Sequence, residues 1–346
     1  MQTSIGVGGY GRGNIDRTVE YVKAADRLGV DYVWSAEAWG QDAVTSLAYL
    51  AAHTNQIKLG TGIMQISART PVMTAMTALS LNALSKGRFV LGLGASGPQV
   101  VEGLHGLRYQ GPLTRLRETV EICRLAFAGE KIRYAGRYHE LPLPGGEGKA
   151  IRLDHPPTSI PIFLATLGPR SLKFTGAHVD GWLGTSFSPD HAAAHLDYIA
   201  KGASQVGRGL EAIELNAPVG IGIGDNIQEM IDSRKPGVAF SMGAMGSATT
   251  NFYNDALQRA GFVDDAKAIQ QLWLDGKREQ AAQRVPDEMV TQFQAIGTRE
   301  MVRERLQKYQ DVGINTLSLR LDTFAENADR IALLEDVLDL VASLRP

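Results

Sequence analysis

Glu37 is the residue whose type and position point most directly to chemistry in this sequence. It follows the apolar run at 32–35, in the string Trp34-Ser35-Ala36-Glu37-Ala38. A carboxyl group at the end of a buried strand could hydrogen-bond a cofactor or move a proton, and burial would raise its pKa. A structural ion pair would suit the same position, so the sequence leaves both roles open.

Glycines stand where two further apolar runs end. The strings are Leu59-Gly60-Thr61-Gly62-Ile63-Met64-Gln65 and Gly92-Leu93-Gly94-Ala95-Ser96-Gly97-Pro98-Gln99. Such glycines would let a flat ligand approach the backbone, although small residues needed for packing would give the same pattern. The second string contains GxGxxG, but the acidic residue expected about 20 residues later is missing, so a Rossmann site is excluded.

A third string, Ala165-Thr166-Leu167-Gly168-Pro169-Arg170-Ser171, predicts a turn that enters a helix. The free N–H groups of a helix start, together with Arg170 and Ser171, could bind an anion such as a phosphate. An ordinary helix start is the alternative. A fourth string, Gly181 to Phe187, adds the hydroxyl groups of Thr185 and Ser186 after another apolar run.

Other chemistry finds little support in the sequence. His191 and His195 are spaced i,i+4, but no glutamate completes HExxH, which favours a solvated helix face over a zinc site. Cys123, the single cysteine, lies in a helical pattern and is expected to be a buried small hydrophobe. The GxSxG elbow of serine hydrolases is missing. We therefore expect no metal site and no serine nucleophile.

The elements that must position these residues are eight short apolar runs, most followed by a helical pattern. The strands are expected at 4–8, 32–35, 57–62, 88–94, 160–165, 181–184, 214–221 and 316–320. Repeated strand and helix units predict an α/β fold, a (β/α)₈ TIM barrel, in which chemistry occurs at the C-terminal ends of the strands. Residues 1–346 are expected to form one domain with insertions at about 98–159 and 225–297, the second with Met242, Met245, Phe252 and Tyr253 as lining or core.

The composition of the chain limits the classes of protein to which it can belong. The 346 residues carry 35 basic and 37 acidic side chains, a net charge of −2, and 44% are apolar. The balanced charge gives no footprint for nucleic acid or an anionic membrane, and the longest apolar windows are interrupted by polar residues. We expect a cytoplasmic enzyme with a small-molecule substrate. Its 38 glycines, about 11% of the chain, exceed the usual share of about 7%.

Taken in order, these strings resemble the luciferase-like family of flavin- and deazaflavin-dependent enzymes. The resemblance rests on Val33 to Ala38, on Ile57 to Ile66 with Arg69-Thr70-Pro71, on Gly87 to Val100, and on Ala165 to Pro169 with Asp180-Gly181-Trp182. The strings GIMQI and SGPQ are similar to the actinobacterial branch related to methylenetetrahydromethanopterin reductase, which uses the deazaflavin coenzyme F420. The resemblance implies a bacterial luciferase-like TIM barrel, a homodimer, and a non-prolyl cis peptide between Gly62 and Ile63 behind the cofactor ring.

The resemblance also implies a set of site residues. Glu37 takes the place of an acidic catalytic residue near the ring, and Thr185 and Trp39 would meet the substrate. The residues expected to bind the cofactor are Glu37, Gly62, Ile63, Gln65, Ala95, Ser96, Gly97, Gln99, Leu167, Gly168, Arg170 and Ser171. Ala38 stands where some alcohol and sugar-phosphate dehydrogenases of the family have a histidine that transfers a proton.

The function implied is hydride transfer between coenzyme F420 and a small organic substrate. Two alternatives stay open: an FMN-dependent monooxygenase of the same fold, and a non-catalytic protein that binds a flavin.

Overall fold

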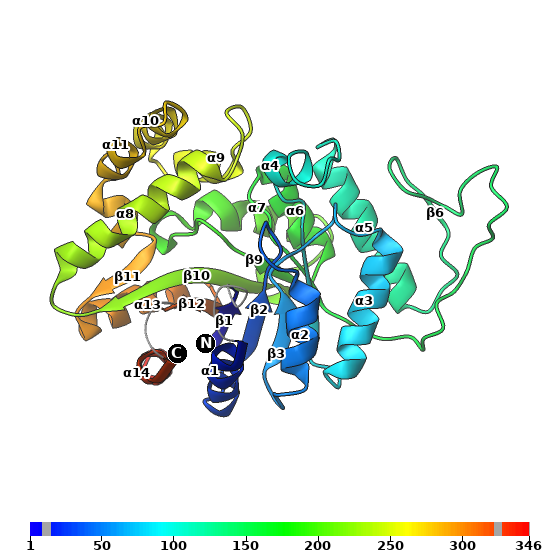
Figure 1. The fold of residues 1–346 in the computed structure, drawn as a ribbon, viewed down its shortest axis with the longest axis horizontal. Coiled ribbons are helices and arrows are strands. Elements are labelled where there is room, and N and C mark those ends of the chain that lie inside the picture. The colour runs from blue at the N-terminus through cyan, green and yellow to red at the C-terminus, as the bar shows by residue number, and fades with distance from the viewer. Residues whose placement is uncertain (9–14, 322–326, 346) are drawn as a thin grey trace. The chain divides into compact units, whose positions relative to one another are not determined.

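A computed structural model describes residues 1–8, 15–321 and 327–345 of the chain (Figure 1). The chain divides into two compact units. Unit 1 comprises residues 1–6, 166–178 and 182–346, and unit 2 comprises residues 7–165 and 179–181. Each unit is described by itself below.

In chain order the strands are β1 (Gln2–Val7), β2 (Tyr32–Ser35), β3 (Lys58–Thr61), β4 (Met64–Gln65), β5 (Phe89–Gly94), β6 (Tyr134–Ala135), β7 (Glu140–Leu141), β8 (Ile162–Leu164), β9 (Gly181–Leu183), β10 (Glu214–Ile223), β11 (Gln294–Gly297) and β12 (Thr316–Arg320). In the described part of the chain, parallel pairing joins β1 with β12, β10 with β11 and β12, β2 with β3, β3 and β4 with β5, and β5 with β8, whereas β6 and β7 form an antiparallel hairpin.

Helices follow most of the strands. They are α1 (Ile15–Arg27), α2 (Ala43–Ala51), α3 (Pro71–Leu84), α4 (Pro98–Val101), α5 (Pro112–Phe127), α6 (Pro169–His178), α7 (Ala193–Ser204), α8 (Ile227–Ala244), α9 (Phe252–Arg259), α10 (Val263–Leu274), α11 (Arg278–Gln283), α12 (Asp287–Thr291), α13 (Arg299–Asp311) and α14 (Asn327–Ala342), with short 3₁₀ turns at Pro189–His191 and Leu210–Ala212.

In unit 2, parallel pairing joins β2 to β3, β3 to β5 and β5 to β8. All six residues of β5 are buried, as expected of a parallel strand that is covered on both faces. Two helices begin with side-chain caps: the Asp42 carboxylate accepts from Thr45 N at 2.7 Å, and Thr70 caps α3 ahead of Pro71. These caps set where the loops after β2 and β4 end.

In unit 2, Asp26 and Arg88 hold the loop that precedes β3. The Asp26 carboxylate accepts hydrogen bonds from the backbone N–H groups of Asn55, Gln56 and Ile57 at 2.7–2.9 Å. The Arg88 guanidinium donates to Ile57 O at 2.6 Å and to the Thr54 carbonyl and hydroxyl oxygens. Arg88, part of a string shared with the family, therefore ties the loop before β3.

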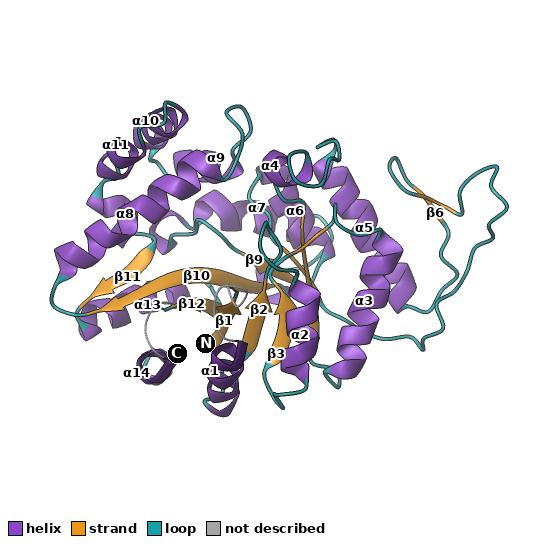
Figure 2. Ribbon diagram, viewed as in Figure 1, coloured by secondary structure: helices purple, strands orange, loops and turns teal. Residues whose placement is uncertain are grey.

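In unit 1, β12 pairs with β1 and with β10, and β10 continues past β12 to pair with β11. Figure 1 shows α8 beside the long β10, and Figure 2 shows helices gathered at this part of the unit. Helices α9, α10, α11 and α12 all pack against α8. Residues 225–297, which we predict to be an insertion, contain these helices and also β11, which the sequence did not predict.

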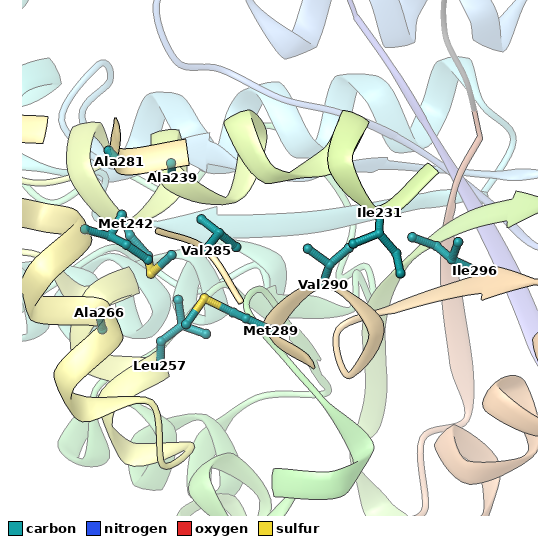
Figure 3. Close-up of a cluster of buried hydrophobic side chains, with 11 residues drawn as sticks. Ile231, Ala239, Met242, Leu257, Ala266, Ala281, Val285, Met289, Val290 and Ile296 are labelled. Carbon is teal, nitrogen blue, oxygen red and sulfur yellow. The ribbon is translucent and has the colours of Figure 1, made fainter. Parts of the chain in front are cut away.

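The helical insertion has a hydrophobic core of its own (Figure 3). Met242 is fully buried there, beside Leu257, Met289 and Val285. Of the four apolar candidates named for this insertion, Met242 therefore belongs to the helical core and lines no site. Met245 and Tyr253 are half-buried, and Phe252 is exposed.

The eight predicted strands are all present, and they alternate with helices as in a (β/α)₈ barrel. Tyr32–Ser35 and Thr316–Arg320 have the predicted bounds. Between α5 and β8, strands β6 and β7 form an antiparallel hairpin, and Figure 2 shows it extending beyond α3 and α5. That the chain forms a single domain stays a prediction. In the described part of the chain, none of the helices is long and apolar enough to cross a membrane.

Candidate active site

In unit 2, the Glu37 carboxylate is held on both oxygens. Arg69 Nη2 lies 2.8 Å from Oε1, and Arg69 Nη1 donates to Oε2 at 2.8 Å. The backbone N–H groups of Ala43 and Gln65 donate to Oε1 and Oε2 at 3.3 and 3.2 Å. The Glu37 side chain is 5% exposed and the Arg69 side chain 19%. The ion pair that the sequence left open is therefore present, in the bidentate form that arginine makes with a carboxylate.

The Glu37–Arg69 pair connects three segments that follow separate strands. Glu37 comes after β2, Arg69 comes after β4, and Ala43 begins α2. Arg69 belonged to a string matched to the family but was not predicted as a site residue. The sequence did offer a signal for Arg69: it follows one predicted strand end as Glu37 follows another. A mostly buried carboxylate needs a partner of opposite charge, and Arg69 could supply it.

Gln65 extends this group toward solvent. Its side chain is buried, and its Nε2 lies 3.1 Å from Nε2 of His105, which is exposed on the segment after α4. Ser67 donates to Gln65 Oε1 at 3.4 Å. His105 is thus an unpredicted ionisable group beside a predicted site residue. Because its position depends on the path of the chain after α4, sequence spacing gave no signal for it.

The peptide bond between Gly62 and Ile63 is cis, as predicted. The glycines around it, however, have a packing role. A Cβ on Gly60 would lie 2.0 Å from Trp34 Cζ3, and one on Gly62 would lie 3.0 Å from Trp34 Cβ. A Cβ on Gly94 would lie 3.0 Å from the Ile63 side chain. Close packing of these side chains, the alternative named for the glycine pattern, therefore accounts for all three glycines.

Trp34 is the centre of this packing. Its indole stacks on Tyr32 with ring centroids 5.4 Å apart and an interplanar angle of 9°, and it contacts the Phe163 ring at 5.8 Å. Gly181 makes room for Phe163 as Gly60 does for Trp34, since its Cβ would lie 2.5 Å from that ring. Large aromatic side chains facing bare backbone therefore fill this part of unit 2.

The segment after β5 opens to the surface. Ala95, Ser96 and Gly97 are half-buried and Gln99 is exposed, whereas β5 itself is buried. Ser96 adopts a left-handed conformation with φ of 58°, which is uncommon for a residue other than glycine. Its carbonyl accepts from the Tyr109 hydroxyl at 3.2 Å, and burial raises the pKa of Tyr109 to about 12. Tyr109 therefore acts as a neutral donor that holds this turn.

The predicted anion-binding residues lie in unit 1. Gly168 precedes α6, Ser171 Oγ donates to Gly168 O at 2.9 Å, and Arg170 is exposed. Leu167 is buried, and its carbonyl accepts from Arg259 Nη2 at 2.6 Å. Burial lowers the pKa of Arg259. Arg259, from α9, was not predicted, and it adds a partly buried cation beside the start of α6.

The two predicted substrate residues lie in different units. Thr185 is half-buried in the segment after β9 in unit 1. Trp39 is 62% exposed in the segment after β2 in unit 2.

The histidine pair on α7 and the preceding turn differs from the expectation. His195 is 1% exposed and packs between the rings of Trp182 and Phe187, with neither ring nitrogen hydrogen-bonded. Burial lowers its pKa to about 4. His191 is half-buried, with Nε2 2.8 Å from Gln292 Oε1. The expected solvated helix face was therefore wrong for His195, because α7 turns it toward the aromatic side chains that follow β9.

Two further side-chain groups limit the chemistry. Cys123 is buried as predicted, and burial raises the pKa of its thiol to about 12, which makes it a poor nucleophile. The described residues contain no group of three or more His, Cys, Asp or Glu arranged to hold a metal ion.

The candidate residues lie in loops after parallel strands that alternate with helices. This arrangement is that of the (β/α)₈ barrel enzymes, in which the loops after the strands carry the chemistry. Residues 1–316 match the family described as luciferase-like monooxygenase. The chain belongs to this family.

Two named proteins are similar to this chain along most of its length. A protein of Mycobacterium tuberculosis named "Putative coenzyme F420-dependent oxidoreductase Rv3520c" is 36% identical over 342 residues, covering 96% of this chain and 99% of that protein. The 5,10-methylenetetrahydromethanopterin reductase of Archaeoglobus fulgidus is 29% identical and covers 85% of this chain and 86% of its own length.

Among solved structures, the coenzyme F420-dependent tetrahydromethanopterin reductase of Methanopyrus kandleri superimposes with a TM-score of 0.79. It is 22% identical and covers 96% of this chain and 97% of its own. At that identity the likeness shows the fold, the luciferase-like TIM barrel that the sequence predicted.

Proposed function

We propose that this protein is an oxidoreductase that transfers a hydride between coenzyme F420 and a small organic substrate. The observation that carries the proposal is the similarity over almost the whole chain to a relative whose name states F420 dependence. The strings GIMQI and SGPQ, on which the resemblance to the deazaflavin branch rested, both lie at strand ends in unit 2, where a barrel enzyme places its chemistry.

The residues at these positions fit such a coenzyme. A Cβ at Gly168 would meet only Ser171 Oγ, at 3.7 Å, so the backbone at this turn is open to a close ligand. The N–H groups of Arg170 and Ser171 at the start of the ten-residue α6 suit the coenzyme's phosphate. Leu167 and Gly168 would line that part of the coenzyme.

In unit 2, we assign the ring to the surface formed by Gly62, Ile63 and Gln65 and the coenzyme's side chain to Ala95, Ser96, Gly97 and Gln99. Gln65 is buried, Gly62, Ile63, Ala95, Ser96 and Gly97 are half-buried, and Gln99 is exposed at the outer end of this surface. The coenzyme supplies the hydride when bound. The protein orients the ring and the acceptor and excludes water.

Glu37 is the ionisable residue that we assign to this site. Its charge is compensated by Arg69, so it presents no isolated negative charge to an anionic coenzyme. Through Gln65 N it positions the segment that contacts the ring. We expect Thr185 and Trp39 to contact the substrate.

The first test is a titration with coenzyme F420 and, separately, with FMN, monitored by absorbance. We expect F420 to bind at least about tenfold more tightly. Glu37→Gln should lower turnover or F420 affinity at least about tenfold, because one oxygen of the bidentate pair becomes an amide. Glu300→Gln, which removes an exposed carboxylate paired with Arg303, is the matched control and should change neither. Unchanged kinetics of Glu37→Gln would remove Glu37 from the site.

The alternative functions have distinct outcomes. The family's description names a monooxygenase. An FMN-dependent monooxygenase would bind FMN more tightly than F420 and consume oxygen with reduced FMN. A non-catalytic protein would bind the coenzyme tightly but transfer no hydride to any acceptor tested.

We also propose that the protein forms a homodimer. Tyr49 of α2 and Met73 and Met76 of α3 are each at least 45% exposed, and these helices pack side by side in unit 2. Such neighbouring apolar side chains favour contact with a second copy. Sedimentation equilibrium should show a dimer that weakens in Met73→Ser/Met76→Ser, whereas a monomeric wild type would refute the assignment.

A further inference from the structure

The Glu37 carboxylate has no position left from which to give or take a proton. Oε1 accepts from Arg69 at 2.8 Å and from Ala43 N at 3.3 Å, and Oε2 accepts from Arg69 at 2.8 Å and from Gln65 N at 3.2 Å. A carboxylate offers about four acceptor positions in all. A proton on either oxygen would displace one of these hydrogen bonds, so Glu37 is suited to hold the loops of unit 2 and not to serve as an acid.

Hydride addition to an unsaturated substrate also consumes a proton. When a hydride adds to a carbonyl carbon, a C–H bond forms, the π electrons move to the oxygen, and the oxygen takes a proton to give the alcohol. Since Glu37 is fully engaged, another ionisable group has to supply that proton. In the described part of the chain, His105 is the other ionisable side chain that is hydrogen-bonded to a residue of the proposed ring surface.

Hydrogen bonds fix the segment that carries His105. The His105 N–H donates to Val100 O at 3.0 Å, at the end of α4. Farther along the segment, the Tyr109 hydroxyl donates to Ser96 O at 3.2 Å, which ties the segment to the turn after β5. The His105 side chain is exposed, and it is held at a defined place beside Gln65. It can therefore exchange protons with water while it contacts the site.

The contact between Gln65 and His105 assigns a role to each ring nitrogen. An amide nitrogen carries donors only, so Gln65 Nε2, 3.1 Å from His105 Nε2, requires that this ring nitrogen accept and that the imidazole proton lie on Nδ1. Within residues 1–8, 15–321 and 327–345, Nδ1 of His105 has no hydrogen-bond partner. Nδ1 is therefore the nitrogen that is available to a substrate.

Protonation of His105 changes the Gln65 side chain and leaves its backbone in place. An imidazolium carries an N–H on both nitrogens, so the Gln65 amide has to turn over and offer Oε1 to Nε2. The backbone cannot follow, because Gln65 N donates to Glu37 and Gln65 pairs in register with Gly94 of β5. Gln65 Oε1 then stabilises the imidazolium, while the N–H at Nδ1 stays free to give its proton.

The charged groups around His105 come in opposite pairs. On its own segment, Glu102 and Arg108 are both exposed and carry opposite charges. On the side of β4, the group that contacts the imidazole is a neutral amide, and behind it the Glu37 charge is compensated by Arg69. A proton on His105 is therefore not held by an ion pair, as suits an acid that has to release it.

We propose that His105 is the acid–base residue of this site and that Gln65 orients it. In a reduction, the imidazolium gives its Nδ1 proton to the oxygen of a carbonyl compound as the hydride reaches the carbon, and neutral His105 then takes a proton from water. The oxidation of an alcohol follows the same steps in reverse. The proposal rests on the proposed function for the source of the hydride, whereas the hydrogen bond between His105 and Gln65 does not depend on it.

The first test uses the protein without coenzyme. The ring resonances of His105 and the side-chain amide resonances of Gln65 are followed by NMR from about pH 5 to 8, the range in which histidines change charge. We expect the amide resonances to move with the same midpoint as the ring resonances in the wild type and to stay constant in His105→Gln. Amide resonances of the wild type that do not change with pH would overturn the proposal.

The second test measures F420 affinity and turnover with reduced F420, with benzaldehyde, cyclohexanone and cyclohexenone as substrates. His105→Gln should lower kcat at least about a hundredfold, and it should lose the decline in reduction rate that the wild type shows as the pH rises and the imidazolium loses its proton. Its F420 affinity should change less than about threefold. His155→Gln, which removes a half-buried imidazole from the same unit, is the matched control and should change neither quantity.

Chemical rescue separates proton transfer from a structural role. Because His105 is exposed, added imidazole should restore part of the turnover of His105→Ala. Circular dichroism and a melting curve verify that each variant is folded. Turnover of His105→Gln close to that of the wild type, with the same pH dependence, would refute the proposal, and so would a wild type that binds F420 but reduces none of the three carbonyl compounds. Failure of the wild type to bind F420 would instead overturn the proposed function, and the NMR titration would still decide whether His105 orients Gln65.

Discussion

Replacing Gly60 by alanine tests whether the glycines at the strand ends serve packing or ligand approach. The new Cβ would lie within 2.9 Å of three atoms of the Trp34 ring, the nearest at 2.0 Å. Trp34 cannot easily move, since it is 6% exposed and stacked on Tyr32. Overpacking of cores costs typically 1–3 kcal/mol, so we expect Gly60→Ala to lower the free energy of unfolding by about 3 kcal/mol.

Urea unfolding monitored by circular dichroism measures this loss. Gly6→Ala is the matched control, because Gly6 is also a strand glycine and a Cβ there would meet nothing within 4 Å. In a Trp34→Leu background the cost of Gly60→Ala should fall below about 1 kcal/mol, which gives a coupling free energy of about 2 kcal/mol between the two positions. If Gly60→Ala is as stable as Gly6→Ala and instead binds F420 more weakly, the packing explanation is refuted.

Three further changes test other parts of the molecule. Asp26→Asn should lower the free energy of unfolding by about 2–3 kcal/mol at pH 7, because three N–H donors outweigh the effect of burial and lower the pKa of Asp26. The difference in stability from the wild type should shrink as the pH falls below the ordinary value of 3.8 toward that lowered pKa. A difference that does not depend on pH would contradict this explanation. Arg69→Ala should cost about 3 kcal/mol, and little more when combined with Glu37→Gln, whereas additive losses in denaturant unfolding would show that the two residues act separately. As the pH falls from 6.5 to about 4, the wild type should lose up to about 3 kcal/mol of stability, because its unfolded chain binds a proton at His195 that the buried imidazole does not bind. His195→Leu should not show this loss. Parallel melting temperatures of the two proteins over this pH range would refute the prediction.

The elements of the fold could largely be predicted from local patterns. Apolar runs such as those at 32–35 and 316–320 are short, buried and followed by helical patterns, so their bounds match those of β2 and β12. β11 was missed because its four residues follow a succession of short helices, and nothing local separates it from the end of the last one. Its strand character depends on pairing with β10.

The candidate site was predicted in part. Position at a strand end was enough to select Glu37, the family resemblance added Gln65, and a hydrogen bond from Gln65 N to the Glu37 carboxylate connects the two. The partners of these residues, Arg69 and His105, could not be predicted, because a hydrogen bond forms between atoms brought together by the path of loops that carry no periodic signal.

The many glycines of this chain show the difference between what can be predicted from the sequence and what depends on the folded structure. The amino-acid pattern was enough to place glycines at strand ends, to give the order of the strands and helices and to indicate a family. The role of those glycines became evident only in the folded chain, because a missing side chain is as compatible with an open surface as with an aromatic ring pressed against the backbone. At Gly60 the ring of Trp34 occupies that space, whereas a Cβ at Gly168 would meet only Ser171 Oγ, at 3.7 Å. The difference depends on side chains from other strands, and short-range van der Waals repulsion between them and a Cβ is set only when the chain has folded.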